Sequence, residues 1–356
     1  MAKKSSSTKK ASAVESKPRK VRALRREVKT RIDDFLARRP HRSFRLTRRR
    51  DYARSLALPG YWAFTSHVFA VVRQYRRLII GLVAGYGLAT ALLVGLSSQD
   101  SYGQLSQLLD QTSDDIFTDG WEALGQAGLL LFSGLSGSLS PQLTEAQQIF
   151  ATLILLLTWL TTVWLLRAGF AGRKPLLRDG LYNAGGPIVP TALISLVLLV
   201  QLLPATIGII LFNSAATTNL LDSGFMAMII SLGVTVLVIL TAYWVVATIF
   251  ALVVVTLPGM YPLRAMRVAG DMVVGRRIRL MLRIAWLLVG NLFAWVGVVL
   301  PAILLDRAVL SKVPFVQVIP FVPVIIALIS AAIVVWSAAY MYVLYRKVVE
   351  DDASPA

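Results

Sequence analysis

The stretch PGMYPLRAMRVAGDMVVGRRIRLMLR, Pro258 to Arg283, lies between two long apolar runs and decides how the chain is organised. It contains six of the fourteen Lys and Arg residues that follow position 77, and one acid, Asp271. The basic residues are Arg264, Arg267, Arg276, Arg277, Arg279 and Arg283. Because positive charge is retained on the cytoplasmic side of a membrane, a basic amphipathic segment between two spans predicts a cytoplasmic elbow.

The composition is typical of a membrane protein. Hydrophobic residues make up 56% of the 356 residues, and charged residues make up 16%, against about 25% in an average soluble protein. The absence of cysteine excludes disulfides, thiolate metal sites and a cysteine nucleophile. The two histidines, His41 and His67, both precede the first apolar run. We therefore predict that the chain holds no cofactor and no metal ion.

Six apolar segments are each long enough to cross the ~30 Å hydrocarbon core of a bilayer. They lie at about 78–97, 148–169, 188–212, 225–257, 283–305 and 315–345. The sequence thus predicts an all-α polytopic membrane protein. Its six transmembrane helices would form one domain over residues 78–347, with interfacial amphipathic helices beside it.

The distribution of charge predicts which loops face the cytoplasm. No Lys or Arg occurs between Arg77 and Arg167, and that interval contains seven acids. The loop at 98–147 is therefore expected to be extracytoplasmic and helical. Four basic residues lie at the end of the second span or soon after it, and two lie at the end of the sixth. Both termini are accordingly predicted to be cytoplasmic, with a short tail at 348–356.

The N-terminal segment carries the whole charge imbalance. Residues 1–77 contain 23 Lys and Arg against 5 acids, whereas the rest contains 14 of each. Residues 1–54 are predicted to be a basic, largely disordered cytoplasmic tail with a helix at 21–39. Residues 55–77 are predicted to be an interfacial amphipathic helix. The tail either anchors the protein at anionic headgroups or binds RNA, a ribosome or another cytoplasmic protein.

A short internal repeat is visible in two of the loops that are predicted to be cytoplasmic. The loop GRKPLLRDGLYNAGG spans Gly172 to Gly186, and GMYPLRAMRVAGDMVVG spans Gly259 to Gly275. Each loop follows an apolar run and contains Gly, then Pro-Leu, then an amphipathic turn and a further Gly. This pattern predicts two similar helical hairpins.

The spans lack the ionisable groups that transport of ions or protons requires. No Asp, Glu, Lys, Arg or His lies well inside any predicted span. Gln201 and Asn291 are the polar residues of most interest there, because an amide in hydrocarbon needs a hydrogen-bond partner. The sequence also has no phosphate-binding loop and no nucleophile elbow, so we predict that the protein is not an enzyme.

The stretch PLRAMRVAGDMVVGRRIRLMLRIAWLLV, Pro262 to Val289, resembles a motif in the membrane domain of bacterial glycerophosphodiester phosphodiesterases and related stand-alone membrane proteins. The shared pattern is Pro, an amphipathic basic helix, Gly275, and then Arg276, Arg277 and Arg279 leading into a span. The resemblance implies a six-helix domain over residues 65–347 in the bacterial plasma membrane. That family's catalytic barrel needs ~250 further residues, so the phosphodiesterase activity is not expected here.

Three functions are consistent with these observations. The first is a non-enzymatic protein that binds anionic lipid through the six arginines of the Pro258–Arg283 stretch. The second is an adaptor that docks a cytoplasmic protein, ribosome or RNA through residues 1–54. The third is a transporter of a neutral or lipid-like substrate, with a cavity lined by Gln201, Asn291 and threonines. The oligomeric state is left open.

Overall fold

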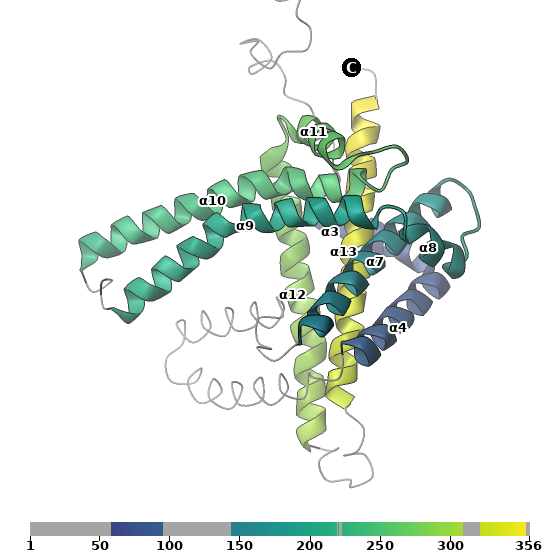
Figure 1. Cartoon of the computed structure of the whole chain (residues 1–356), viewed down its shortest axis with the longest axis horizontal. Helices are drawn as coiled ribbons and strands as arrows, with labels where there is room; N and C mark the ends of the chain where they lie inside the picture. Colours follow the sequence, from purple (N-terminus) through teal and green to yellow (C-terminus); the bar gives the residue numbers. More distant parts are fainter. Residues whose placement is uncertain (1–57, 95–143, 219, 221–222, 309–320, 354–356) are drawn as a thin grey trace, which may run out of the picture. The chain divides into compact units, whose positions relative to one another are not determined.

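The computed structural model describes residues 58–94, 144–218, 220, 223–308 and 321–353, and over these residues it is all-helical (Figure 1). The predicted tail at 1–54, its helix at 21–39 and most of the predicted outer loop at 98–147 lie outside the described residues.

Six long helices match the six predicted spans. They are α4 (Arg76–Leu93), α7 (Glu145–Phe170), α9 (Ile188–Thr217), α10 (Gly224–Val254), α12 (Arg277–Ala308) and α13 (Phe321–Ala353). Each is long and apolar enough to cross a bilayer. The prediction of an all-α multi-pass membrane protein is therefore confirmed.

Two of the predicted span boundaries need correction. The fifth helix begins at Arg277 rather than at 283, because arginine favours helix and several of these arginines have partners in the protein. The predicted start of the sixth span at 315 lies outside the described residues, and the described part of this span is helical from Phe321. It continues to Ala353, so most of the tail predicted at 348–356 is helix.

Three short amphipathic helices accompany the long ones: α3 (Tyr61–Gln74), α8 (Leu177–Ala184) and α11 (Pro262–Val273). In α11, the buried residues Ala265, Ala269 and Val273 recur every four positions, so one stripe of the helix packs into the core. The other side is exposed. Helix α3 has the same arrangement, with Phe64, Val68 and Val71 buried, and its predicted position at the membrane interface stays a prediction.

The internal repeat is present as two helix–elbow–helix units, α7–α8–α9 and α10–α11–α12. The first helix of each unit is followed by a glycine in the left-handed region, Gly172 with φ 73° and Gly259 with φ 74°. Pro-Leu follows three residues after each glycine. A buried threonine at the same position of each unit, Thr161 or Thr248, bonds a side chain of the preceding long helix. The sequence repeat is thus a structural one.

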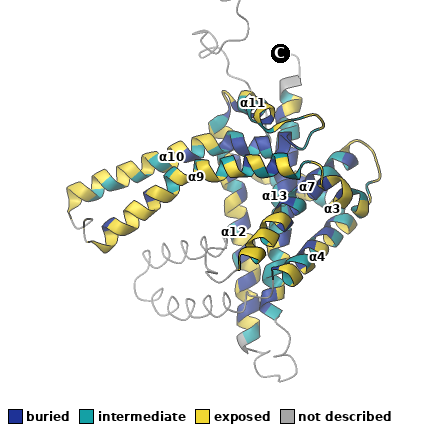
Figure 2. Ribbon diagram, viewed as in Figure 1, coloured by how far each residue is buried: buried dark blue, intermediate teal, exposed yellow. Residues whose placement is uncertain are grey.

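The core lies where α13 is surrounded by the other helices. Residues Ala338–Leu344 are all buried, which is typical of a helix that is covered on every side. The same cluster contains Phe64 of α3, Phe250 of α10 and Leu280 of α12. By contrast, Figure 2 shows that the adjacent halves of α9 and α10 near Thr217 and Gly224 are mostly exposed.

We call the side of the protein on which α8 and α11 lie the elbow side. Four arginines link helix ends there: Arg167, Arg276, Arg283 and Arg346. Two of these arginines lie at or near the start of α12. Arg276, the residue before α12, has its Nη2 2.8 Å from Asp351 Oδ2 of α13, and Arg283 of α12 donates to backbone oxygens before α3. Arg167 Nη1 of α7 donates to the carbonyl oxygen of Thr256, 2.7 Å away, just after α10. Arg346 of α13 lies over an aromatic ring at the end of α7.

We expect Gly259→Ala to destabilise the protein by about 1 kcal/mol, because a side chain disfavours the left-handed conformation. No atom lies within 4 Å of a Cβ added there, so the penalty is conformational rather than steric. Thermal unfolding in detergent measures it. Gly270→Ala in α11 also points into open space but has no positive φ, so it should be neutral or stabilising. Equal midpoints for the two variants would contradict this assignment.

We expect Arg276→Gln to destabilise the protein by roughly 3 kcal/mol, because removal of one partner leaves the other charge in a largely buried position. Asp351→Asn should have the larger effect, since it removes the carboxylate from an Arg276 side chain that is 2% exposed, whereas Arg276→Gln leaves behind a carboxylate that is 17% exposed. The double variant should lose less than the sum of the two single variants. Additive unfolding midpoints would show that the two side chains do not stabilise each other.

Candidate functional site

The six arginines of the Pro258–Arg283 stretch differ sharply in burial. Arg276 and Arg283 are buried, at 3% and 6% exposure. Arg277 is half-buried, and the remaining three are exposed. The exposed arginines are Arg264, Arg267 and Arg279. The sequence groups six equivalent cations, but the structure separates cations that hold the fold from cations that face outward.

Arg283 lies inside the core next to the start of α3. Its guanidinium donates to the carbonyl oxygens of Pro59 and Gly60, the latter 3.4 Å from Nη1. It also lies over the ring of Tyr61, 4.3 Å from the ring centre, and Phe64 is close by. Backbone dipoles and aromatic faces together balance the buried charge. A lipid headgroup therefore has no access to this side chain.

Arg277 and Gln201, which the sequence assigned to different classes of site, lie together around a small pocket of about 170 Å³. The Arg277 guanidinium stacks on the Tyr243 ring at 4.0 Å and donates to the Tyr243 carbonyl oxygen at 3.3 Å. Gln201 Oε1 accepts a hydrogen bond from Thr248 Oγ1 at 2.6 Å, which joins α9 to α10. The Gln201 amide thus has the partner that the sequence required.

Asn291 is buried and lies in a different place from Gln201. Its Nδ2 donates to Ser337 Oγ at 2.8 Å, joining α12 to α13. The cavity beside it, of about 450 Å³, also contains Thr65 and is otherwise lined almost wholly by apolar side chains. The structure does not bring the two amides into one site, so a single polar cavity that contains both is absent from the described part of the chain.

The exposed arginines lie next to exposed apolar residues. Arg264 and Arg267 are on the outer side of α11, beside Tyr261 at 75% and Leu263 at 81% exposure. Arg279 follows Ile278 on α12, which is 70% exposed. Cationic and apolar groups on one surface are typical of segments at the membrane interface.

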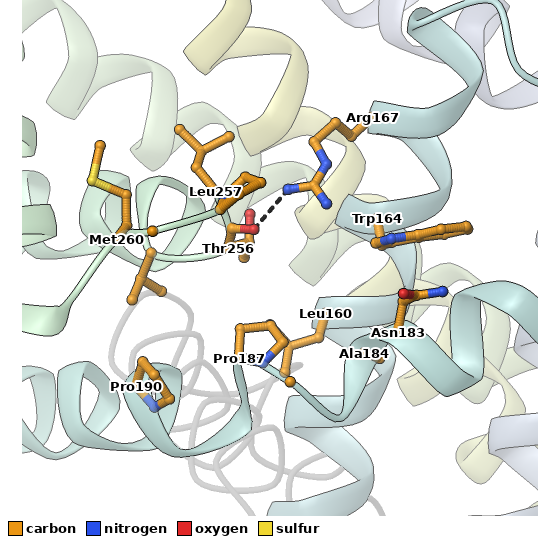
Figure 3. Close-up of a pocket in the computed structure, with 14 residues that line it drawn as sticks. Leu160, Trp164, Arg167, Asn183, Ala184, Pro187, Pro190, Thr256, Leu257 and Met260 are labelled. Atoms are coloured by element: carbon orange, nitrogen blue, oxygen red, sulfur yellow. Dashed lines mark hydrogen bonds between the residues drawn. The ribbon is translucent and has the colours of Figure 1, made fainter.

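A further site, which we call the elbow pocket, lies where the two elbows meet, and the sequence did not predict it (Figure 3). It has a volume of about 270 Å³. Its walls come from the end of α7, the α8–α9 connection and the segment after α10. The lining residues are Leu160, Trp164, Arg167, Asn183, Ala184, Gly186, Pro187, Pro190, Val255, Thr256, Leu257, Pro258, Gly259 and Met260.

The sequence contained one signal for the elbow pocket. Arg167 lies five residues before Gly172, inside the apolar run rather than in the loop after it. A cation in that position needs a partner or an aqueous space, because hydrocarbon cannot solvate it. In the topology prediction, Arg167 contributes only to the positive charge on the cytoplasmic side.

The described residues contain no group of three His, Asp or Glu side chains that could hold a metal ion. Comparison with protein-family models, with curated proteins and with solved structures finds no match to the chain. The resemblance of Pro262–Val289 to the membrane domain of glycerophosphodiester phosphodiesterases therefore stays a prediction. The function has to be argued from the site itself.

Proposed function

We propose that the chain is a non-enzymatic protein of the bacterial plasma membrane, with both termini in the cytoplasm, that binds anionic lipid through Arg264, Arg267 and Arg279. The observation that carries this proposal is that each exposed arginine lies within a few residues of a large exposed apolar residue. Arg276 and Arg283 are no longer included, because they are buried against the protein.

The shape of α11 supports a position in the headgroup layer. Its buried stripe of small residues packs against α10, while Arg264 and Arg267 lie on the opposite side. The long arginine side chains can extend toward phosphates while Leu263 enters the acyl region. Each arginine near an anionic surface contributes about 1 kcal/mol.

The buried contacts of α12 support the proposal in a second way. Arg276 and Arg283 fix the start of α12 to α13 and to the segment before α3. The elbow that carries the exposed arginines is therefore held in one position. A fixed array of cations loses less conformational entropy on binding than a flexible one does.

We expect the triple variant R264Q/R267Q/R279Q to bind phosphatidylglycerol at least about tenfold more weakly, since three contributions of about 1 kcal/mol are removed. Native mass spectrometry of the full chain, offered equal amounts of phosphatidylglycerol and phosphatidylcholine, measures the retained lipid. The protein should remain folded, because all three side chains are exposed.

The variant R264K/R267K/R279K keeps the charges and should keep most of the binding. A variant that lacks residues 1–54 should also retain phosphatidylglycerol. If that deletion alone abolishes lipid retention, the basic tail rather than the elbow binds lipid. If the glutamine variant retains as much phosphatidylglycerol as the unchanged chain, the proposal is wrong.

A further inference from the structure

The elbow pocket is lined by residues of both helix–elbow–helix units. Arg167 and Trp164 come from adjacent turns of α7, and Asn183 comes from the end of α8. The opposite wall is the segment around Thr256, which follows α10. In Figure 3 the Arg167 side chain extends toward Thr256, with Trp164 and Asn183 on the same side of the pocket as the arginine. None of the six arginines predicted from the sequence lines it.

The hydrogen-bond donors of the pocket outnumber their protein acceptors. A guanidinium has five N–H groups, and the one acceptor for Arg167 among the described residues is the carbonyl oxygen of Thr256. This bond fixes the guanidinium and leaves other N–H groups available. Among the described residues, the indole N–H of Trp164 has no hydrogen-bond acceptor. Asn183 Nδ2 donates to the Asp179 carbonyl oxygen at 2.7 Å and keeps a second N–H.

The other walls define what kind of molecule would fit. Arg167 is the one charged side chain among the described lining residues, so the pocket favours an anion over a cation. Leu160, Pro187, Leu257 and Met260 supply apolar surface. A volume of about 270 Å³ is many times what one water molecule needs, so an oxyanion and a short apolar group would fit.

We propose that the elbow pocket binds the phosphate group of one organic phosphate, with Arg167 as its principal ligand and Trp164 and Asn183 as further donors. Several donors gathered on one side of the pocket suit the three or four oxygens of a phosphate, and arginine binds phosphate in a bidentate manner. The phosphate could belong to a soluble monoester or to a lipid headgroup. The site is separate from the exposed arginines, so it does not depend on their binding lipid.

The test uses the full chain in a neutral detergent. Isothermal titration calorimetry with phenyl phosphate and with inorganic phosphate measures binding of the soluble forms. Native mass spectrometry with phosphatidic acid against phosphatidylcholine measures binding of the lipid form. The variants are Arg167→Lys, which can still donate to Thr256, and Trp164→Phe and Asn183→Ala, which each remove one donor. Arg178→Gln is the matched control, because it removes an 89% exposed cation from the same elbow.

We expect R167K to weaken binding on the order of tenfold or more, because a charge-assisted pair of hydrogen bonds is replaced by a single contact. W164F and N183A should each weaken it several-fold, while R178Q and R264Q/R267Q/R279Q should leave phenyl phosphate binding unchanged. Binding of phenyl phosphate that R167K weakens supports a soluble ligand. Retention of phosphatidic acid that R167K weakens supports a lipid ligand with the same chemistry.

The proposal is overturned if the unchanged chain binds neither phosphate form. It is also overturned if binding is the same in R167K, W164F and N183A. Should R167K fail to fold, the comparison of W164F and N183A with R178Q decides the outcome in the same way. Asn183 is exposed, so its replacement is not expected to affect folding.

Discussion

The structure of the elbow side depends on which acceptors the buried guanidinium groups of Arg276 and Arg283 find in the protein. A guanidinium does not lose its proton inside a protein, so a buried one must find acceptors. Arg283 donates hydrogen bonds to backbone oxygens that lie 223 and 224 residues earlier in the chain. Arg276 forms an ion pair with the carboxylate of Asp351. These contacts fix the start of α12 against two distant segments. Since α11 directly precedes α12, the buried arginines also hold in place the helix on which Arg264 and Arg267 are exposed.

The helices could be predicted from the sequence because their signals are local. Apolar runs gave the six spans, and the repeated Gly and Pro-Leu gave both elbows, with a positive φ at Gly172 and Gly259. The different roles of Arg276 and Arg277 could not be predicted in the same way. These neighbours are identical in type, yet one pairs with Asp351 and the other stacks on Tyr243. The difference arises from which side of α12 faces α13 and which faces α10, and that is a property of packing.

The misplaced start of the fifth span has the same cause. The sequence predicts a fifth span that starts at about Arg283, the last arginine of the stretch. Arg283 lies nearly two turns inside α12 because the protein replaces water as its partner. Pro59 and Gly60 precede α3, so the Pro59 carbonyl oxygen is not used by a helix and can accept from Arg283. The non-helical Pro59–Gly60 segment and the buried charge of Arg283 therefore form a single structural contact.

The two helix–elbow–helix units use the same backbone pattern for different chemistry. Five residues before the left-handed glycine, the first unit has Arg167 and the second has Val254, which is fully buried in the core. A cation at that position in the second unit would lie in the apolar cluster around α13, whereas in the first unit it borders the elbow pocket. The second unit instead carries its cations on α11 and around the start of α12. The same local structure thus occurs twice with its arginines at different positions. As a result, the elbow side has Arg167 at the elbow pocket and a separate set of exposed arginines.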